Sequence, residues 1–230
     1  MATSYPFRPI VTNGLVLSFD AKNLKSYTGT GSNLYDLTSN NNNGLLQNDS
    51  IFIFDSIEFD GVDDYCSVYY DTTKIPYGTQ SISVNAWFLP KRGFSNGEEI
   101  IGIGSNSYSG ARVGIWLADN LYIEGANCGV YESSLFNYNE EWINVSFTVP
   151  DGPSNFSDIK LYVNGYQVLT DVLNDTLINI DPQEILLAAI PGSGLQGTFK
   201  GNISTIQIYN RSLTSSEVLQ NYNAIKNRYY

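Results

Sequence analysis

Alternation of polar and apolar residues dominates the middle of the chain. Residues 81–88 read Ser-Ile-Ser-Val-Asn-Ala-Trp-Phe, and residues 142–149 repeat the pattern as Trp-Ile-Asn-Val-Ser-Phe-Thr-Val. A period of two places every second side chain on the same face of a β-strand. We therefore predict a strand in each segment. The apolar positions of both strands should face one core: Val84, Ala86, Val145 and Phe147.

Shorter runs of the same kind recur along the chain, separated by Gly, Asn and Asp. Further strands are predicted at residues 14–20, 51–54, 56–59, 65–69, 99–103, 112–117, 121–123, 184–189 and 202–209. The strongest turn signal is Asn164-Gly165, which favours a type I′ turn because both residues accept positive φ. Many short strands joined by turns predict an all-β protein with two antiparallel sheets packed as a sandwich.

The C-terminus follows a different pattern. Thr214 and Glu217 form a capping box, the usual start of a helix. Apolar residues then recur at helical spacing through Val218, Tyr222 and Ile225. We predict a short C-terminal helix that lies against the sandwich.

The start of the chain has no clean period. Residues 1–13 contain Pro6 and Pro9 and are predicted to form an extended arm, while residues 14–230 are long enough for one large all-β domain. A frayed terminus is the alternative. The arm contains candidate partner-binding residues, three of them large and apolar and one basic: Tyr5, Phe7, Ile10 and Arg8.

Five segments, in order, resemble the laminin-G-like, concanavalin A-like jelly-roll superfamily. Residues 59–65 read Phe-Asp-Gly-Val-Asp-Asp-Tyr and are similar to a recurrent segment of that family. The other four similar segments are residues 81–90, 142–149, 161–166 and 201–217. The resemblance spans residues 14–220 and implies a jelly-roll sandwich that presents a binding surface.

The opening of the domain resembles a narrower group. Residues 14–27 and 35–44 are similar to versions of this domain found in structural proteins of tailed bacteriophages, with Tyr35 in place of the usual Trp. The resemblance implies a virion structural protein, such as a capsid decoration, head-fibre or tail-associated subunit with a lectin-like surface. Its expected partners are other virion proteins, further copies of itself, and a host glycan. We expect synthesis in the host cytoplasm and a final location in the virion.

Charge narrows the possible partners. The formal net charge is −11, with 12 Lys and Arg against 23 Asp and Glu. Phosphate-rich partners attract basic proteins, so nucleic acid and anionic membranes are disfavoured. No apolar run approaches the roughly 20 residues of a membrane-spanning helix. The chain has two cysteines, Cys66 and Cys128, which are expected to be buried and unpaired.

Catalytic patterns are sparse. The chain has no His, which excludes Ser-His-Asp and Cys-His arrangements. It also lacks the Glu-x-Asp-x-Glu strand that glucanases of related fold use. Adjacent glutamates such as Glu98 and Glu99 should point to opposite faces of a strand. We therefore predict that the protein is not an enzyme. A carbohydrate-binding module is the main alternative to the virion subunit, and a glycan-active hydrolase is disfavoured.

One acidic loop is a candidate metal site. Asp60, Asp63 and Asp64 offer the oxygen ligands that Ca²⁺ prefers, although Ca²⁺ takes about 6–8 of them. A turn in which the carboxylates accept hydrogen bonds from nearby amides is the favoured interpretation. No cofactor is required on either interpretation.

Aromatic residues offer a further candidate surface. Trp87, Trp116 and Trp142 are expected to pack in the core. Exposed tyrosines are better candidates for a surface that contacts sugar or protein, although cross-strand packing is the favoured role for them as well. They are Tyr69, Tyr70, Tyr108, Tyr131 and Tyr138.

Overall fold

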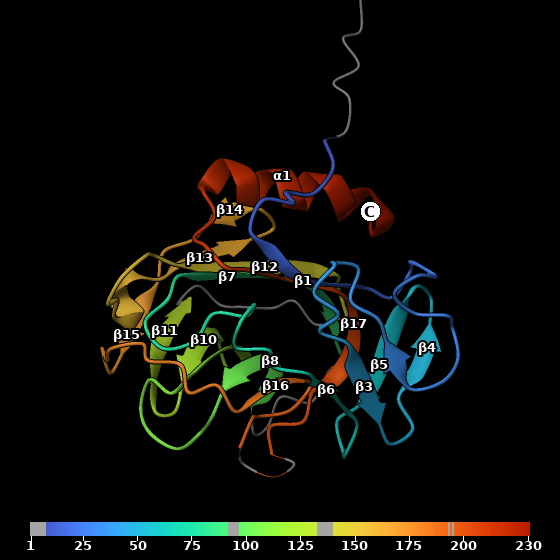
Figure 1. The fold of residues 1–230 in the computed structure, drawn as a ribbon, viewed down its shortest axis with the longest axis horizontal. Coiled ribbons are helices and arrows are strands. Elements are labelled where there is room, and N and C mark those ends of the chain that lie inside the picture. Colours follow the sequence, from blue (N-terminus) through green and yellow to red (C-terminus); the bar gives the residue numbers. More distant parts are fainter. Residues whose placement is uncertain (1–7, 92–96, 133–139, 193, 195) are drawn as a thin grey trace, which may run out of the picture.

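Two antiparallel β-sheets packed face to face make up most of the molecule. The computed structural model describes residues 8–91, 97–132, 140–192, 194 and 196–230. Figure 1 shows the two layers, with an α-helix lying on the outside of one of them. All strand pairs within the described residues are antiparallel. The predicted all-β sandwich with a short C-terminal helix is confirmed.

The eight-stranded sheet lies under the helix. Its hydrogen-bonded order is β14 (Tyr166–Gln167), β13 (Lys160–Val163), β12 (Ile143–Val149), β7 (Ile82–Pro90), β17 (Lys200–Tyr209), β5 (Ser56–Asp60) and β4 (Ile51–Ile53), and β1 (Leu15–Asp20) also pairs with β17.

The nine-stranded sheet forms the other layer. Its order is β15 (Asp171–Leu173), β11 (Cys128–Glu132), β10 (Leu121–Gly125), β9 (Arg112–Leu117), β8 (Glu98–Gly104), β16 (Glu184–Leu187), β6 (Tyr65–Val68), β3 (Gly44–Gln47) and β2 (Asn33–Leu34). The helices are η1 (Phe156–Asp158), α1 (Ser215–Ile225) and η2 (Lys226–Arg228). None of the described helices combines the length and the apolar character needed to cross a membrane.

The core fills the space between the sheets. Val84 pairs with Phe147 and Ala86 pairs with Val145 across β7 and β12, and all four side chains are buried in the main apolar cluster. Burying such side chains stabilises the fold by about 1.5–3 kcal/mol each. The predicted inward face of these strands is therefore confirmed. Both cysteines are buried and unpaired, as expected.

Local turn and cap chemistry also follow the sequence. Asn164 and Gly165 have φ of 49° and 81°, as a type I′ turn requires. Thr214 caps α1 and forms the full capping box with Glu217. Arg211 makes two hydrogen bonds to the Glu217 carboxylate, at 2.9 and 2.6 Å. These bonds favour the ionised form and lower the pKa of Glu217 to about 2.

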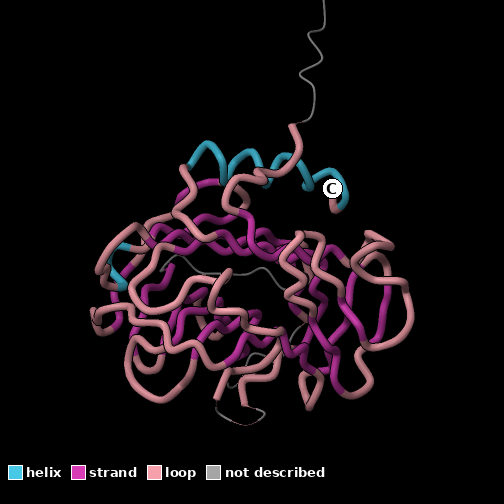
Figure 2. The backbone as a smooth tube through the Cα atoms, in the orientation of Figure 1, coloured by secondary structure: helices cyan, strands magenta, loops and turns pink. Residues whose placement is uncertain are grey.

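Helix α1 lies over the outer face of the eight-stranded sheet, as the tube in Figure 2 shows. Trp87 projects from β7 on this side and stacks on Tyr229 and Tyr222, with ring centroids 4.4 and 5.6 Å away. The segment before β1 lies along the helix as well. The amide of Val11 donates to Asn221 at 2.8 Å, and the hydroxyl of Tyr209 donates to the Val11 carbonyl at 3.0 Å. Trp87, Tyr209 and Asn221 on this face are therefore fully buried although they lie outside the main core.

Candidate functional site

Three aromatic side chains cross the outer face of the nine-stranded sheet. Trp116 on β9 pairs with Tyr122 on β10, and Tyr122 pairs with Tyr131 on β11. Their neighbours along each strand face the core, so these three face outward. All three are half-buried, and the two tyrosine rings lie 5.3 Å apart. We call Trp116, Tyr122 and Tyr131 the aromatic row.

The row is held in place by its surroundings. Gly97 and Gly197 lie against the Trp116 ring so closely that a Cβ at either position would come within 2.0 and 2.6 Å of ring atoms. Glycine at these positions therefore lets the backbone enclose the indole. The Tyr122 hydroxyl donates to Asp119 at 2.8 Å. The rings are thus fixed before any ligand arrives, which lowers the entropy lost on binding.

A cluster of charged side chains lies beside the row. Arg112 on β9 forms ion pairs with Glu99 on β8 and Glu124 on β10, and Glu99 is the cross-strand neighbour of Trp116. The Arg112 guanidinium is 3.4 Å from the Glu99 carboxylate. We call Arg112, Glu99 and Glu124 the charged cluster. It brings two carboxylates from different strands to one cation.

Glycines make room for the charged cluster. A Cβ at Gly114 would lie 2.0 Å from a Glu99 carboxylate oxygen, and one at Gly102 would lie 2.8 Å from the same oxygen. The Glu99 carboxylate therefore rests directly on the sheet, in contact with backbone. Glu99 and Arg112 are almost completely buried.

Burial of the charged cluster lowers the stability of the fold. Both Glu99 oxygens and two of the Arg112 nitrogens have no hydrogen-bond partner among the described residues. Desolvation raises the pKa of Glu99 well above its usual range, and the nearby positive charge of Arg112 only partly opposes this. Burial also raises the pKa of Glu124. Buried charges with unmade hydrogen bonds are costly to stability and gather at functional sites.

Glu98 lies next to Glu99 but has different partners. It accepts a hydrogen bond from the Lys200 amide at 3.1 Å. Burial raises its pKa to about 7, although this hydrogen bond and the Lys200 charge oppose the shift. The two adjacent glutamates do not form a pair, as the sequence predicted. The sequence missed the pairing of Glu99 with Glu124 through Arg112. The signal that could have found it is the pair of glycines, Gly102 and Gly114, in otherwise apolar strands.

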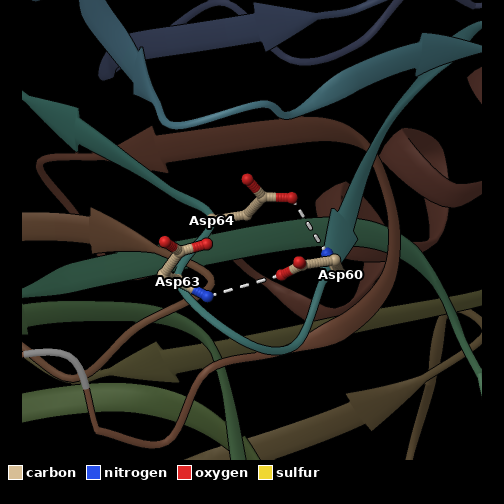
Figure 3. Close-up of side chains that lie close together, drawn as sticks. All are labelled: Asp60, Asp63 and Asp64. Carbon is tan, nitrogen blue, oxygen red and sulfur yellow. Dashed lines mark hydrogen bonds between the residues drawn. The ribbon is translucent and has the colours of Figure 1, made fainter.

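The acidic loop that was predicted as a metal site follows β5. Figure 3 shows Asp60, Asp63 and Asp64 together, and one carboxylate oxygen from each lies within 4.8 Å of the other two. Asp60 accepts from the Val62 amide at 2.7 Å, and Asp64 accepts from the Asp60 amide at 3.0 Å. Gly61 has φ of 78°, which a turn here requires. The favoured turn is therefore present, and it orients the same three carboxylates.

The three neighbouring carboxylates of this loop repel one another, and a bound cation would relieve that repulsion. Burial raises the pKa of Asp64, and the charges of Asp60 and Asp63 raise it further. Asp60 and Asp63 are exposed, so their oxygens face solvent. These three carboxylates fit a hard cation such as Ca²⁺, with the remaining ligands supplied by other groups or water.

The other predicted contact residues are dispersed. Arg8 is exposed, and Ile10 is half-buried in a hollow beside α1, while Tyr5 and Phe7 lie outside the described residues. Tyr69 and Tyr108 are exposed and Tyr70 is half-buried, away from the aromatic row, while Tyr138 is again outside the described residues. Trp87 is fully buried, but Trp116 and Trp142 are only half-buried and lie on outer faces.

The family of the chain is settled by a family model. The model described as the Concanavalin A-like lectin/glucanases superfamily matches residues 60–219, more than half of the chain. The chain belongs to this superfamily. No curated protein sequence matches the chain significantly.

Solved structures with the same fold have low sequence identity to this member of the superfamily. Domain 4 of AbnA, a GH43 extracellular arabinanase from Geobacillus stearothermophilus in complex with arabinotriose, is 17% identical with a TM-score of 0.65, covering 90% of this chain and 98% of that domain. Trypanosoma rangeli sialidase is 14% identical with a TM-score of 0.71, covering 99% of this chain and 36% of the sialidase. The binding domain of Paraclostridial Mosquitocidal Protein 1 is 17% identical with a TM-score of 0.63, covering 93% of this chain and 53% of that domain.

These neighbours contradict the prediction that the protein is not an enzyme. Two of them come from glycan-active enzymes, an arabinanase and a sialidase, and this chain spans about a third of the sialidase's length. The prediction treated missing motifs as an exclusion. The absence of His and of a Glu-x-Asp-x-Glu strand excludes only mechanisms that need those groups. Carboxylates can also come from separate strands, as Glu99 and Glu124 do at Arg112.

Proposed function

We propose that the chain is a glycan-recognition domain whose binding surface is the outer face of the nine-stranded sheet. The observation that carries this proposal is the aromatic row, held in register across three strands beside the charged cluster. Sugar rings have an apolar face of C–H bonds and an edge of hydroxyl groups. Half-buried aromatic rings suit the apolar face of the sugar. Glu124, which is less buried than its partners, suits the hydroxyl groups.

The structural neighbours support the choice of ligand class. One was solved with arabinotriose and another with a sialic acid derivative. Their identities are too low to transfer a sugar or a reaction. We propose that this chain binds the glycan on which a glycan-active protein acts. The proposal names neither the sugar nor a reaction.

The test is a binding assay on a glycan array, followed by calorimetry with the best oligosaccharide and with arabinotriose. Tyr122→Ala should lower the affinity about tenfold or more, since the truncated ring is a main contact. The matched control is Tyr166→Ala, because Tyr166 is 66% exposed on β14 of the other sheet. Tyr166→Ala should leave the affinity within about twofold of the parent. Equal losses in both variants, or in neither, would refute the assignment of this face.

The acidic loop after β5 calls for a separate test, by thermal unfolding. We propose that Asp60, Asp63 and Asp64 bind Ca²⁺ and stabilise the loop after β5. Added Ca²⁺ should then raise the melting temperature, and Asp63→Asn should abolish that increase. An unchanged melting temperature with millimolar CaCl2 would leave the loop as a turn only.

The first segments of the domain, residues 14–27 and 35–44, support a proposal about where the protein is used. Because residues 14–27 and 35–44 resemble phage structural proteins, we propose display in many copies on a virion. Deletion of residues 2–8 removes Tyr5, Phe7 and Arg8 but keeps the Val11 contacts with α1. The shortened chain should fold and be incorporated less efficiently. Equal incorporation would argue against a role for these three residues in attachment.

A further inference from the structure

A cavity of about 380 Å³ opens on the other side of the molecule, beside η2. This volume lies within the range of about 300–1,000 Å³ found for small-molecule sites. Figure 1 shows the β4–β5 hairpin and the C-terminus on the same side of the molecule. The cavity is lined by Phe54, Asp55, Trp142, Ser204, Arg228 and Tyr229.

The floor of the cavity is aromatic and rigid. Trp142 and Tyr229 lie with ring centroids 4.5 Å apart, and both are half-buried. The Tyr229 hydroxyl donates to Ser204 Oγ at 2.7 Å, and Ser204 Oγ donates to the Asp55 carbonyl at 2.9 Å. Burial raises the pKa of Tyr229 to about 12, so its hydroxyl stays protonated at neutral pH. This chain of hydrogen bonds ties the floor to the β4–β5 turn.

The rim of the cavity carries balanced charge. Arg228 forms an ion pair with Asp20, with one guanidinium nitrogen 2.9 Å from both carboxylate oxygens, and Lys22 forms an ion pair with Asp55. Two acids and two bases leave no net charge here. Such a rim favours a neutral polar ligand, since a charged ligand would gain no net attraction.

The turn above the cavity is strained. Phe54 and Asp55 have φ of 46° and 64°, and a bulky residue with positive φ is an outlier. Asn and Gly are the residues that this type of two-residue turn prefers. Phe54 is also 90% exposed, so its ring gains little from packing within the chain. Strain that packing does not offset points to a role in binding.

We propose that this cavity is a second carbohydrate site, which binds a neutral pyranose between Phe54 at the rim and the Trp142–Tyr229 floor. The proposal rests on the proposed function, glycan recognition by this chain, and adds a site on the opposite sheet. The rings would contact the apolar face of the sugar. Asp55 and Arg228 would hydrogen-bond its hydroxyl groups.

The test combines stability with binding in the full chain. Phe54→Asn relieves the strain, because Asn tolerates positive φ, and should raise the melting temperature by roughly 2–4 °C. It should also weaken binding of neutral methyl pyranosides about tenfold or more, as seen by NMR at the Trp142 indole and the Ser204 amide. Phe54→Tyr keeps the ring and should bind like the parent. N-acetylneuraminic acid serves as the anionic comparison and should bind more weakly.

Several results would overturn the second site. One is a more stable Phe54→Asn variant that binds the methyl pyranosides unchanged, and another is a less stable variant, which would remove the strain argument. Preference for N-acetylneuraminic acid would contradict the neutral ligand. Signals that change at Trp116 and Tyr122 but not at Trp142 would refute this site and leave the proposed function intact. Changes at Trp142 alone would refute the nine-stranded face instead.

Discussion

The two outer faces of the sandwich both carry polar side chains, but these side chains differ in charge and in hydrogen bonding. On the eight-stranded sheet, Asn85 donates to Gln207 at 2.9 Å and accepts from Asn144 and Ser146 at 2.8 and 2.6 Å. These are neutral groups that hydrogen-bond to one another under α1, and among them Asn144 Oδ1 has no partner within the described residues. On the nine-stranded sheet, Arg112 and Glu99 are ionisable groups that are almost completely buried and short of hydrogen-bond partners.

This difference indicates that the polar groups under α1 support the fold, whereas those on the nine-stranded sheet are kept for binding. A neutral network in which most groups are hydrogen-bonded costs little to bury. An underpaired charged cluster is costly, and a hydrophobic replacement of similar volume is often as stable. The nine-stranded sheet retains this cluster beside half-exposed aromatic rings. The comparison therefore favours the nine-stranded face as the one used for binding.

The largest expected effect comes from removing the cation of the charged cluster. Arg112→Met leaves Glu99 and Glu124 without their partner and should lower the free energy of unfolding at pH 7 by about 3–5 kcal/mol. Urea unfolding measures this. The control is Arg211→Met, which breaks a partly exposed pair with Glu217 beside α1 and should cost about 1 kcal/mol. A loss no greater than that of the control would remove the contrast between the faces.

Glu98 on β8 and Glu217 on α1 should change the stability of the protein with pH in opposite directions. Glu98 has a pKa raised to about 7, so the folded state binds more protons than the unfolded state above pH 4.5. Stability from this group is complete below about pH 4.5 and is lost as the pH rises through 7, by about 3 kcal/mol. Glu98→Gln should remove this part of the decline in urea unfolding between pH 4.5 and 7.5, and Glu99 and Glu124, whose pKa values burial also raises, account for the remainder.

Glu217 provides the matched control. Its pKa is lowered to about 2, so its contribution is present above pH 4.5 and is lost as the pH falls through 2. Glu217→Gln should flatten only this acidic limb. A Glu98→Gln protein whose stability still falls between pH 4.5 and 7.5 as in the parent would contradict the assignment.

The smallest effect should come from the cap of α1. Thr214→Ala removes the side chain that accepts from the Glu217 amide and should lower stability by about 1 kcal/mol. Thr72→Ala, at an exposed loop threonine, should change it by less than about 0.5 kcal/mol. Thermal unfolding of both variants checks this. Equal melting temperatures would show that the cap contributes nothing to helix docking.

Local chemistry made much of the fold predictable. Asn164-Gly165 and the Thr214–Glu217 box act over a few residues, and alternation in β7 and β12 records which face is buried. These signals need no knowledge of the remote chain. They therefore predicted the turn, the helix and the inward side chains correctly.

The candidate sites depend on information that local patterns lack. Glu99, Arg112 and Glu124 come together only through strand order, and a bulge between Glu99 and Ile101 interrupts the period of two. Phe54 occupies a turn position that no propensity rule assigns to it. The enzyme prediction failed for a related reason, because it searched single strands for a catalytic motif.

Chemical-shift mapping by NMR, with a glycan identified on the array, tests most directly whether the outer face of the nine-stranded sheet binds the glycan. We expect the largest shifts on β9, β10 and β11 around Trp116, Tyr122 and Tyr131, and no response from Asn85 and Asn144 under α1. Shifts centred on the α1 face, with the aromatic row unchanged at saturating glycan, would contradict it.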